Sequence, residues 1–419
     1  MVSLRESGSR ETVRGVSKAA LDALIEAHGE GAISAQMRYD ALARFEELPV
    51  RQVIRGRRGW KHDLSKLDFS EVAPIGAFGN APSARQSPSL PAGVVVTDFD
   101  TARTQHRAAF EAAFGAAVDT RDDKFASLAL AFQRGGVFIW VPDGICVDEP
   151  IVINYDLNEG SAFPYSLVAL GSGATATVIQ RLGGSARAGF LCGISELVVG
   201  DAARLTFATR QMGGIGARSI VTRRARLGRN AKLAFADAEL GAEHAVMRLR
   251  VTMSEPGAEA EVSGLFFANA DQHVDLETEV VHAAGATHSE TLIRSAGTGR
   301  GQGRYVGNIK ILKAAHGADA SLRDDALLLS QESHVDSIPA LEIAANDVKA
   351  FHGATVGAIS EDEIFYAQTR GLERAEAERM IALGFFEPAI ARFPGEALRE
   401  ELRVALEAKL GHTAQGNSQ

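Results

Sequence analysis

The stretch Gly173-Ala-Thr-Ala-Thr-Val-Ile179 contains the pattern that decides the fold, a glycine followed by alternating small and β-branched residues. The motif Gly-x-x-Ala-x-(Val/Leu) recurs at Gly200, Gly228, Gly257 and Gly317, and the first four glycines are 27, 28 and 29 residues apart. A period near 28 residues with one glycine corner is typical of a chain that coils into stacked turns of β-strand. The sequence therefore predicts a mainly β fold, a β-solenoid.

Two weaker copies support this period. A degenerate copy begins at Gly285, and another, with Val147, begins at Gly144. Runs such as Ala258-Glu-Ala-Glu-Val262 alternate with period two, which directs small apolar residues inward and polar residues outward on a pleated strand. Stacked turns share a core that no single turn could bury. A β-sandwich whose turns happen to recur is the alternative.

Helical patterns flank the β-rich part of the chain. Apolar residues recur at helical spacing in Ser17 to His28, Ser34 to Leu48, Thr104 to Phe114 and Phe125 to Phe132. Ser360-Glu-Asp-Glu363 has the form of a capping box, and we expect two or three short helices ending near Pro388 and a final helix from Glu396 to Leu410. We divide the chain into an N-terminal helical region and linker (1–95), a helical lead-in (96–136), a solenoid core (137–357) and a C-terminal helical region with a disordered polar tail (358–419).

The composition describes a folded, soluble and mildly acidic protein. The 419 residues include 44 Lys and Arg against 53 Asp and Glu, a net charge of −9, and 46% are apolar. The negative charge argues against general nucleic-acid binding, in spite of the short basic run from Arg55 to Lys61. Neither a signal peptide nor a long apolar span is visible, so we expect a cytoplasmic protein that does not bind membranes.

Two cysteines, Cys146 and Cys192, limit the chemistry of the chain. They cannot form a disulfide framework or a four-thiolate zinc or iron–sulfur site. The phosphate-binding motif Gly-x-x-x-x-Gly-Lys-(Ser/Thr) is also absent, since the stretch from Gly297 to Gly303 lacks the lysine. If the process that involves this protein needs ATP, another chain must bind it.

The first dense group of titratable residues is His273-Val-Asp-Leu-Glu-Thr-Glu279. Alternation puts the histidine and the three acids on one face of a strand, with Val274 and Leu276 on the other. This spacing suits metal ligands, but the solvated outer face of any solenoid strand has the same pattern. Both interpretations stay open at this point.

The second group lies where the repeats end. Its members are His334, Asp336, Glu342, Asp347 and His352. Because Gly353 follows His352, backbone can pass close to this imidazole. An imidazole is a metal ligand or a proton carrier near neutral pH, although a single histidine is often only structural.

This second group lies within a series of distinctive motifs. They are Ser337-Ile-Pro-Ala-Leu-Glu-Ile343, Asn346-Asp-Val-Lys349, His352-Gly-Ala-Thr-Val-Gly357, Ser360-Glu-Asp-Glu-Ile-Phe-Tyr366 and Arg370-Gly-Leu372. Two earlier stretches agree with them, Trp60-Lys61 and Val141-Pro-Asp-Gly-Ile-Cys-Val-Asp-Glu-Pro-Ile151. Together the motifs span most of the chain, and they resemble the SufB/SufD family of iron–sulfur cluster assembly proteins, its SufD branch in particular.

The resemblance implies a right-handed parallel β-helix flanked by N-terminal and C-terminal helices. It also implies a scaffold subunit without enzymatic activity, which pairs edge to edge with SufB through the β-helix and binds the SufC ATPase through the C-terminal helical region. In that region Phe365, Tyr366, Arg370, Phe385 and Phe386 are candidates for the SufC interface.

The resemblance further implies that His352 lies at the SufB interface and takes part in cluster formation, which makes it the candidate metal ligand as well. We expect no cofactor bound stably by this chain alone, and a nascent iron–sulfur cluster at the SufB interface with a thiolate from SufB. Some SufD proteins have a cysteine two residues before this histidine, where this chain has Ala350. A thiol role at that position is therefore absent, and the absence also weighs against SufB identity.

Two functions of other classes stay open. A carbohydrate-active β-helix enzyme would use carboxylates and aromatic residues on its surface, but aromatic residues make up only 6% and His273 to Glu279 is the single dense acidic ladder. A self-contained homodimeric module is the other alternative, because the edge of a β-helix can pair with a second copy.

Overall fold

The computed structural model describes residues 15–28, 32–50, 64, 67–70, 72, 83–85, 90–119, 121, 123–134, 136–157, 160–184 and 189–411. Trp60-Lys61, the basic run from Arg55 to Lys61 and the polar tail from His412 lie outside these residues. The helices are α1 (Lys18–His28), α2 (Ala32–Glu47), α3 (Phe99–Gln105), α4 (Arg107–Ala113), α5 (Lys124–Phe132), α6 (Glu361–Thr369), α7 (Arg374–Ile390) and α8 (Glu396–Gly411). The strands are β1 (Ser83–Arg85), β2 (Val95–Asp98), β3 (Val137–Val141), β4 (Ile151–Asp156), β5 (Ser161–Ala162), β6 (Tyr165–Leu170), β7 (Thr175–Gly183), β8 (Phe190–Val199), β9 (Arg204–Met212), β10 (Arg218–Leu227), β11 (Lys232–Glu239), β12 (His244–Met253), β13 (Glu259–Ala268), β14 (His273–His282), β15 (His288–Gly297), β16 (Gln302–Ile311), β17 (Asp319–Leu328), β18 (His334–Ile343) and β19 (Lys349–Ala358).

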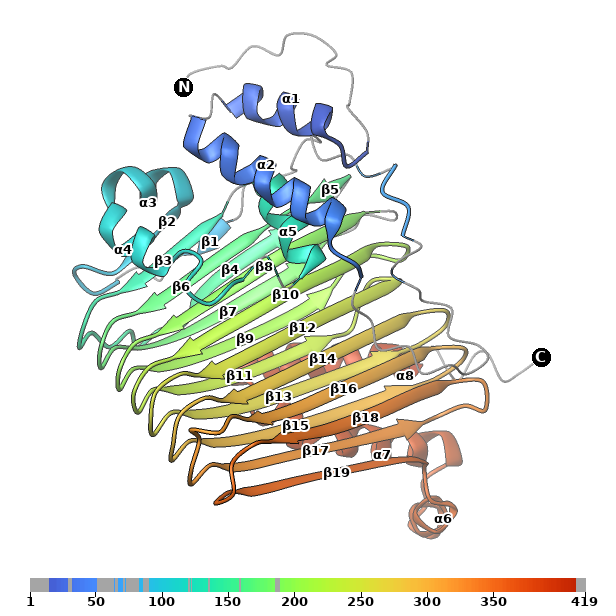
Figure 1. Ribbon diagram of the computed structural model, residues 1–419. Coiled ribbons are helices and arrows are strands. Elements are labelled where there is room, and N and C mark those ends of the chain that lie inside the picture. The colour runs from blue at the N-terminus through green and yellow to red at the C-terminus, as the bar shows by residue number, and fades with distance from the viewer. Residues whose placement is uncertain are drawn as a thin grey trace.

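Within these residues the strands form two long sheets (Figure 1). One sheet has nine strands in the order β1-β4-β7-β9-β11-β13-β15-β17-β19, and the other has ten described strands in the order β18-β16-β14-β12-β10-β8-β6-β3-β2. Neighbours pair in parallel, except that β1 and β2 are antiparallel to β4 and β3. From β6 onward successive long strands alternate between the sheets, so each turn of the chain contributes one strand to each sheet. This arrangement confirms the predicted β-solenoid and its parallel strands.

The corners of the solenoid explain the glycine period and correct its register. One left-handed backbone position recurs in successive turns of the described chain, at Gly144, Gly173, Ala202, Asn230, Gly257, Ala286 and Gly317. The strand registers make these positions equivalent. Gly200 and Gly228 instead lie two residues earlier, where a Cβ on Gly228 would come within 2.4 Å of Asp201 Oδ1. The sequence motif therefore merged two different steric needs for glycine, a positive φ and a close approach of two turns.

Apolar side chains from both sheets fill the interior of the solenoid. In β4, for example, Ile151, Ile153 and Tyr155 are buried there, and the residues between them are less buried. The same alternation runs through the later strands, which confirms the predicted period of two. The register and this alternation together determine which residues face the interior.

Helices cover the outer face of each sheet (Figure 1). The N-terminal helices pack on the ten-stranded sheet, where Phe125 and Phe132 of α5 join a cluster with Phe190 and Ile194 of β8. Helices α7 and α8 pack on the nine-stranded sheet. Both sheets are therefore shielded on two faces, which accounts for their many apolar outward residues.

Three details of the helices differ from the predictions. The helix expected from Thr104 to Phe114 is interrupted at His106, whose backbone (φ −126°, ψ 33°) is not helical, so α3 and α4 are separate. Ser360 is the N-cap of α6, but its side chain makes no capping hydrogen bond, and three acidic residues in the first turn favour the helix N-terminus instead. Helix α7 continues past Pro388 to Ile390, because a proline in the last turn removes little of the hydrogen-bond ladder.

The two ends of the solenoid differ. At the N-terminal end, Leu90, Val94 and Val96 pack against the interior and β2 pairs with β3. At the C-terminal end, β18 and β19 each have a sheet neighbour on one side only. No further strand of the described chain extends either sheet, and α6 stands apart beyond β19 (Figure 1). The last turn of the solenoid is therefore open.

Candidate functional site

His352 lies on β19, the last strand of the nine-stranded sheet. Its register partner on β17 is Leu322, and Ala350 pairs with Ala320. Ala320 and Leu322 belong to the interior of the solenoid, and side chains in register on adjacent parallel strands share a face. His352 therefore faces the inner side of the last turn, but it is exposed because no strand lies beyond β19.

Exposed apolar side chains accompany His352 at this open end. Ile343 of β18 is 46% exposed, and Phe351 and Val356 of β19 are 62% and 43% exposed. Leu341 is half-buried at an inward position of β18. Sheet edges with unpaired backbone groups and exposed apolar side chains are typical places of strand-to-strand association. The open end is thus suited to being covered by another protein surface.

A buried carboxylate, Asp324 on β17, lies beneath this last turn. It is paired in register with Ala354 of β19 and shares its strand face with Leu322. Asp324 is fully buried, and neither of its carboxylate oxygens has a hydrogen-bond partner in the described chain; the Ser337 hydroxyl of β18 is in the same position. Burial raises the pKa of Asp324 to about 6, although the Ser337 hydroxyl and the Arg294 guanidinium act in the opposite direction. The sequence analysis did not single out this residue.

The other members of the second titratable group do not join His352. His334 Nε2 lies 3.0 Å from Asp336 Oδ1, and both residues lie on the outer face of β18 together with Glu342. Asp347 is exposed in the corner between β18 and β19. Nearness in sequence therefore does not produce a joint site, because alternate strand residues point to opposite faces.

The acids of β14 are neutralised by arginines of the neighbouring strands. All lie on the outer face of the ten-stranded sheet, and Asp275 is buried, so this face is not simply solvated. The ion pairs are Arg304 to Asp275 (Nε to Oδ1 2.8 Å), Arg248 to Glu277 (Nε to Oε2 3.2 Å) and Arg250 to Glu279. Guanidinium groups occupy the places that a metal ion would need. These carboxylates also lack the freedom that a pair of glycosidase acids would require.

Within the described residues, no group of three or more His, Cys, Asp or Glu side chains is arranged to hold a metal ion. His352 could supply at most part of a coordination shell. In the same part of the chain, no helix is long and apolar enough to cross a membrane.

Neither cysteine is near His352 or activated as a nucleophile. Cys146 is exposed at the first corner of the solenoid, and its Sγ lies 3.6 Å from Asp148 Oδ1. Cys192 of β8 is buried, and its thiol donates to the Phe125 carbonyl at 3.3 Å. Desolvation raises the pKa of both thiols, and Asp148 adds to this effect at Cys146. A thiolate at the open end must come from another chain.

The five candidates in the C-terminal helices fall into two groups. On α6, Phe365 and Tyr366 are 67% and 61% exposed, and the Arg370 guanidinium lies 5.2 Å from the Tyr366 ring. On α7, Phe385 is half-buried under an arginine of β15, and Phe386 is fully buried against the nine-stranded sheet. The exposed group is available for direct contact with a partner, and the other group attaches α7 to the solenoid.

A charged cluster inside the solenoid was also missed by the sequence analysis. Arg223 Nη1 lies 2.9 Å from Asp237 Oδ1 and 3.6 Å from Glu239 Oε1, and Arg223 Nη2 donates to the Thr209 hydroxyl at 2.9 Å. Burial raises the pKa of Asp237 to about 6, and burial together with the Asp237 charge raises the pKa of Glu239 well above its usual range. The available signal was the alternation, since Asp237 and Glu239 occupy the same strand face as the buried Leu233.

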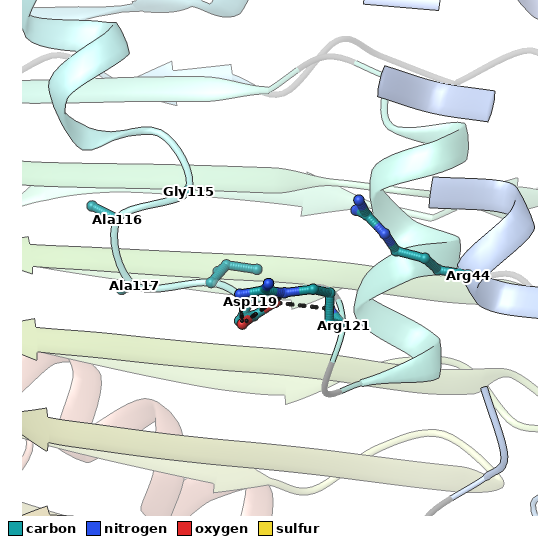
Figure 2. A pocket seen from close by; sticks show the side chains of 7 residues that line it. Arg44, Gly115, Ala116, Ala117, Asp119 and Arg121 are labelled. Atoms are coloured by element: carbon teal, nitrogen blue, oxygen red, sulfur yellow. Dashed lines mark hydrogen bonds and ion pairs between the residues drawn. The ribbon is translucent and has the colours of Figure 1, made fainter. Parts of the chain in front are cut away.

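A hollow of about 440 Å³ beside α2 is not built as an anion site (Figure 2). It is lined by Arg44 and by residues 115–119 and 121, and Arg121 is paired with Asp119 at 2.7 Å. The backbone N–H groups of Gly115, Ala117 and Val118 point instead to the buried Glu196 carboxylate, at 2.7 to 2.9 Å. The amides that could hold an anion are thus used within the fold.

Comparisons with known proteins agree with this architecture. Residues 153–385 match the family model described as SUF system FeS cluster assembly, SufBD core domain, and residues 55–153 match the SufBD protein N-terminal region. An iron-sulfur cluster assembly SufBD family protein of Staphylococcus epidermidis (strain ATCC 12228) is 27% identical over 316 residues, which cover 74% of this chain and 68% of the relative. A SufBD family protein of Staphylococcus aureus (strain MRSA252) is 28% identical over the same coverage. The core match spans more than half of the sequence, and the chain therefore belongs to the SufB/SufD family of iron–sulfur cluster assembly proteins.

Proposed function

We propose that this chain is a SufD-like scaffold subunit that assembles iron–sulfur clusters together with SufB and the SufC ATPase, in the cytoplasm and without catalytic activity of its own. The observation that carries the proposal is the open end of the solenoid, where the exposed edges of β18 and β19 carry His352. Covering this end would bury Ile343, Phe351 and Val356, which favours association. SufB is the partner that the family resemblance suggests, because a second β-helix could extend both sheets.

The ligands of the nascent cluster would then come from two chains. This chain offers the His352 imidazole, while its two thiols lie in earlier turns of the solenoid and are not activated. A SufB cysteine would supply the thiolate that an iron–sulfur cluster needs. The cluster is the product of assembly, and we expect no cofactor to stay bound to this chain alone.

SufC would bind the C-terminal helices. Phe365, Tyr366 and Arg370 form an exposed surface on and after α6 that suits direct contact. Phe385 and Phe386 would act by holding α7 to the nine-stranded sheet. ATP-driven closure of two SufC subunits could thus strain the β-helix pair and expose His352 with a SufB cysteine, so that iron and sulfide are assembled there.

The first experiment replaces His352 with alanine and measures cluster recovery on the purified complex with SufB and SufC. We expect a complex of normal composition with most of its cluster lost. His334→Ala is the matched control, because His334 is exposed on the adjacent terminal strand but lies on the outer face. Unchanged recovery with His352→Ala in an intact complex would contradict the assigned site.

The second experiment mixes the chain with SufB and SufC and follows the complex by size-exclusion chromatography. We expect co-elution, and weaker SufC retention when both Phe365 and Tyr366 are replaced by serine. Val404→Ser is the control, since Val404 is 56% exposed on α8 and away from this surface. A chain that forms a dimer with itself and excludes both proteins would support the homodimeric module instead.

A further inference from the structure

Asp324 occupies a place in the solenoid interior where the fold itself asks for an apolar residue. On the nine-stranded sheet its row continues through Ile293 on β15, Gly264 on β13 and Asp237 on β11. The two nearest members below it are apolar or lack a side chain, and Ala354 lies above it on β19. A purely structural residue at this position would be apolar as well.

Comparison with Asp237 in the same row shows what Asp324 lacks. The Asp237 carboxylate has the Arg223 guanidinium 2.9 Å away inside the solenoid. In the described chain, Asp324 has no ion pair, and both of its oxygens are without hydrogen bonds. Arg294, which acts on Asp324 from β15, is paired with Asp325 on the outer face. An uncompensated buried carboxylate costs several kcal/mol, so it needs a cation or a proton in place of the missing partner.

The groups around Asp324 suit a metal cation. Asp324 and His352 are diagonal neighbours on adjacent strands, because Leu322 pairs with His352 and Asp324 pairs with Ala354. Such positions have Cα atoms about 7 to 8 Å apart, within reach of two long side chains that share a face. The Ser337 hydroxyl, also buried without a partner, acts on Asp324 from β18. Carboxylate, hydroxyl and imidazole together form a donor set for a divalent first-row metal ion.

We propose that Asp324 is a ligand, together with His352, for the ferrous ion that is incorporated at the open end of the solenoid. The inference rests on the proposed function, in which iron is substrate and a partner supplies the thiolate. Only β19 separates Asp324 from this end, and β19 has a sheet neighbour on one side alone. Edge strands open locally at low cost, so a small displacement of Ala354 admits the ion.

The test is anaerobic titration of the purified chain with Fe²⁺, and in parallel with Co²⁺, whose visible absorption reports its ligands. Asp324→Asn keeps the shape of the side chain and removes its charge, and we expect it to weaken binding of both ions at least tenfold. Asp319→Asn is the matched control, because Asp319 is exposed on the same strand at an outward position, and we expect affinity within twofold of the parent chain. Equal affinity of Asp324→Asn and the parent chain, or equal losses in both variants, would overturn the proposal.

Thermal unfolding separates a ligand from a structural residue. Removal of an unpaired buried charge should leave Asp324→Asn as stable as the parent chain or more so, whereas a residue that holds the fold together would lose stability along with metal binding. If Asp324→Asn does not fold, Asp324→Ala with the same titration gives the answer. Co-elution with SufB and SufC tests the proposed function independently: an intact complex in which His352→Ala loses the cluster and Asp324→Asn binds iron normally would refute this inference alone.

Discussion

The charged cluster inside the solenoid leads to a prediction in which two partners of one ion pair behave very differently. Arg223 is the single cation in contact with two buried carboxylates, Asp237 and Glu239. Glu239 is kept protonated by burial and by the Asp237 charge, so it is a reserve partner for the guanidinium. We therefore expect Arg223→Met to be strongly destabilising and Asp237→Asn to be mild.

The magnitude follows from the protons involved. Without Arg223, the Asp237 carboxyl must stay neutral at pH 7.5, which costs about 5 kcal/mol relative to an unfolded carboxyl of pKa ~3.9. Its native pKa of about 6 means that the parent protein already bears about 3 kcal/mol of this cost. The remaining 2 kcal/mol or so, with roughly 1 to 2 for the lost hydrogen bond to Thr209 and the altered packing, gives a defect of about 3 to 4 kcal/mol.

The defect of Arg223→Met should depend on pH. A raised native pKa means that the folded state holds a proton that the unfolded state releases, so stability falls as pH rises toward that pKa. In the parent protein this loss ends near pH 6, whereas in Arg223→Met it continues through pH 7.5. The defect should therefore shrink by about 2 kcal/mol when the pH is lowered from 7.5 to 6. In Asp237→Asn, Glu239 can ionise and pair with Arg223, so we expect a loss below about 1.5 kcal/mol.

Urea unfolding followed by far-ultraviolet circular dichroism at both pH values measures these differences, with equal m-values as the condition for comparing midpoints. The double variant Arg223→Met with Asp237→Asn completes the cycle and should recover part of the loss. Two results contradict the reasoning: equal losses in the two single variants, or an Arg223→Met defect that is the same at pH 6 and pH 7.5.

Three further predictions concern other parts of the fold. His282 is fully buried with both ring nitrogens bonded to hydroxyls and its pKa lowered to about 4 by burial, so stability should fall by about 1.4 kcal/mol per unit as pH drops from 6.5 toward 4; His282→Gln should lack this slope in urea midpoints. Glu196→Gln should cost about 1 to 3 kcal/mol and speed amide exchange at residues 115–118, since the carboxylate accepts three of their N–H groups; normal protection there would contradict the assigned contact. At equivalent corners, Gly257→Ala (φ +75°) should destabilise by about 1 to 2 kcal/mol and Ala286→Gly (φ 55°) should stabilise by up to about 1, and thermal melts with the same sign for both would be inconsistent with the register.

The solenoid could be predicted from sequence because its signal is local and repeated. Period-two alternation in runs such as Ala258 to Val262 identifies the strand faces, and one chain-length interval recurs in turn after turn. The register could not be read in the same way. Ala202, Asn230 and Ala286 adopt the left-handed corner without glycine, while Gly200 and Gly228 are required by close approach two residues earlier. An alignment on glycine alone therefore placed the middle turns in the wrong register.

His352 stood out in the sequence by its motif, but its surroundings could not be predicted, because they are set by pairing between turns. Asp324 and His352 are 28 residues apart and meet only when the β17–β19 register is known, whereas Asp336 and His334 lie closer in sequence and face away. The same register distinguishes two aspartates that look alike in the sequence. Asp237 has an internal arginine and Asp324 does not, so the interior of the solenoid supplies a cation in its middle turns and leaves one missing beneath its open end. An acid that the fold leaves unpaired at the point where a partner must bind is better explained by what arrives there than by what holds the chain together.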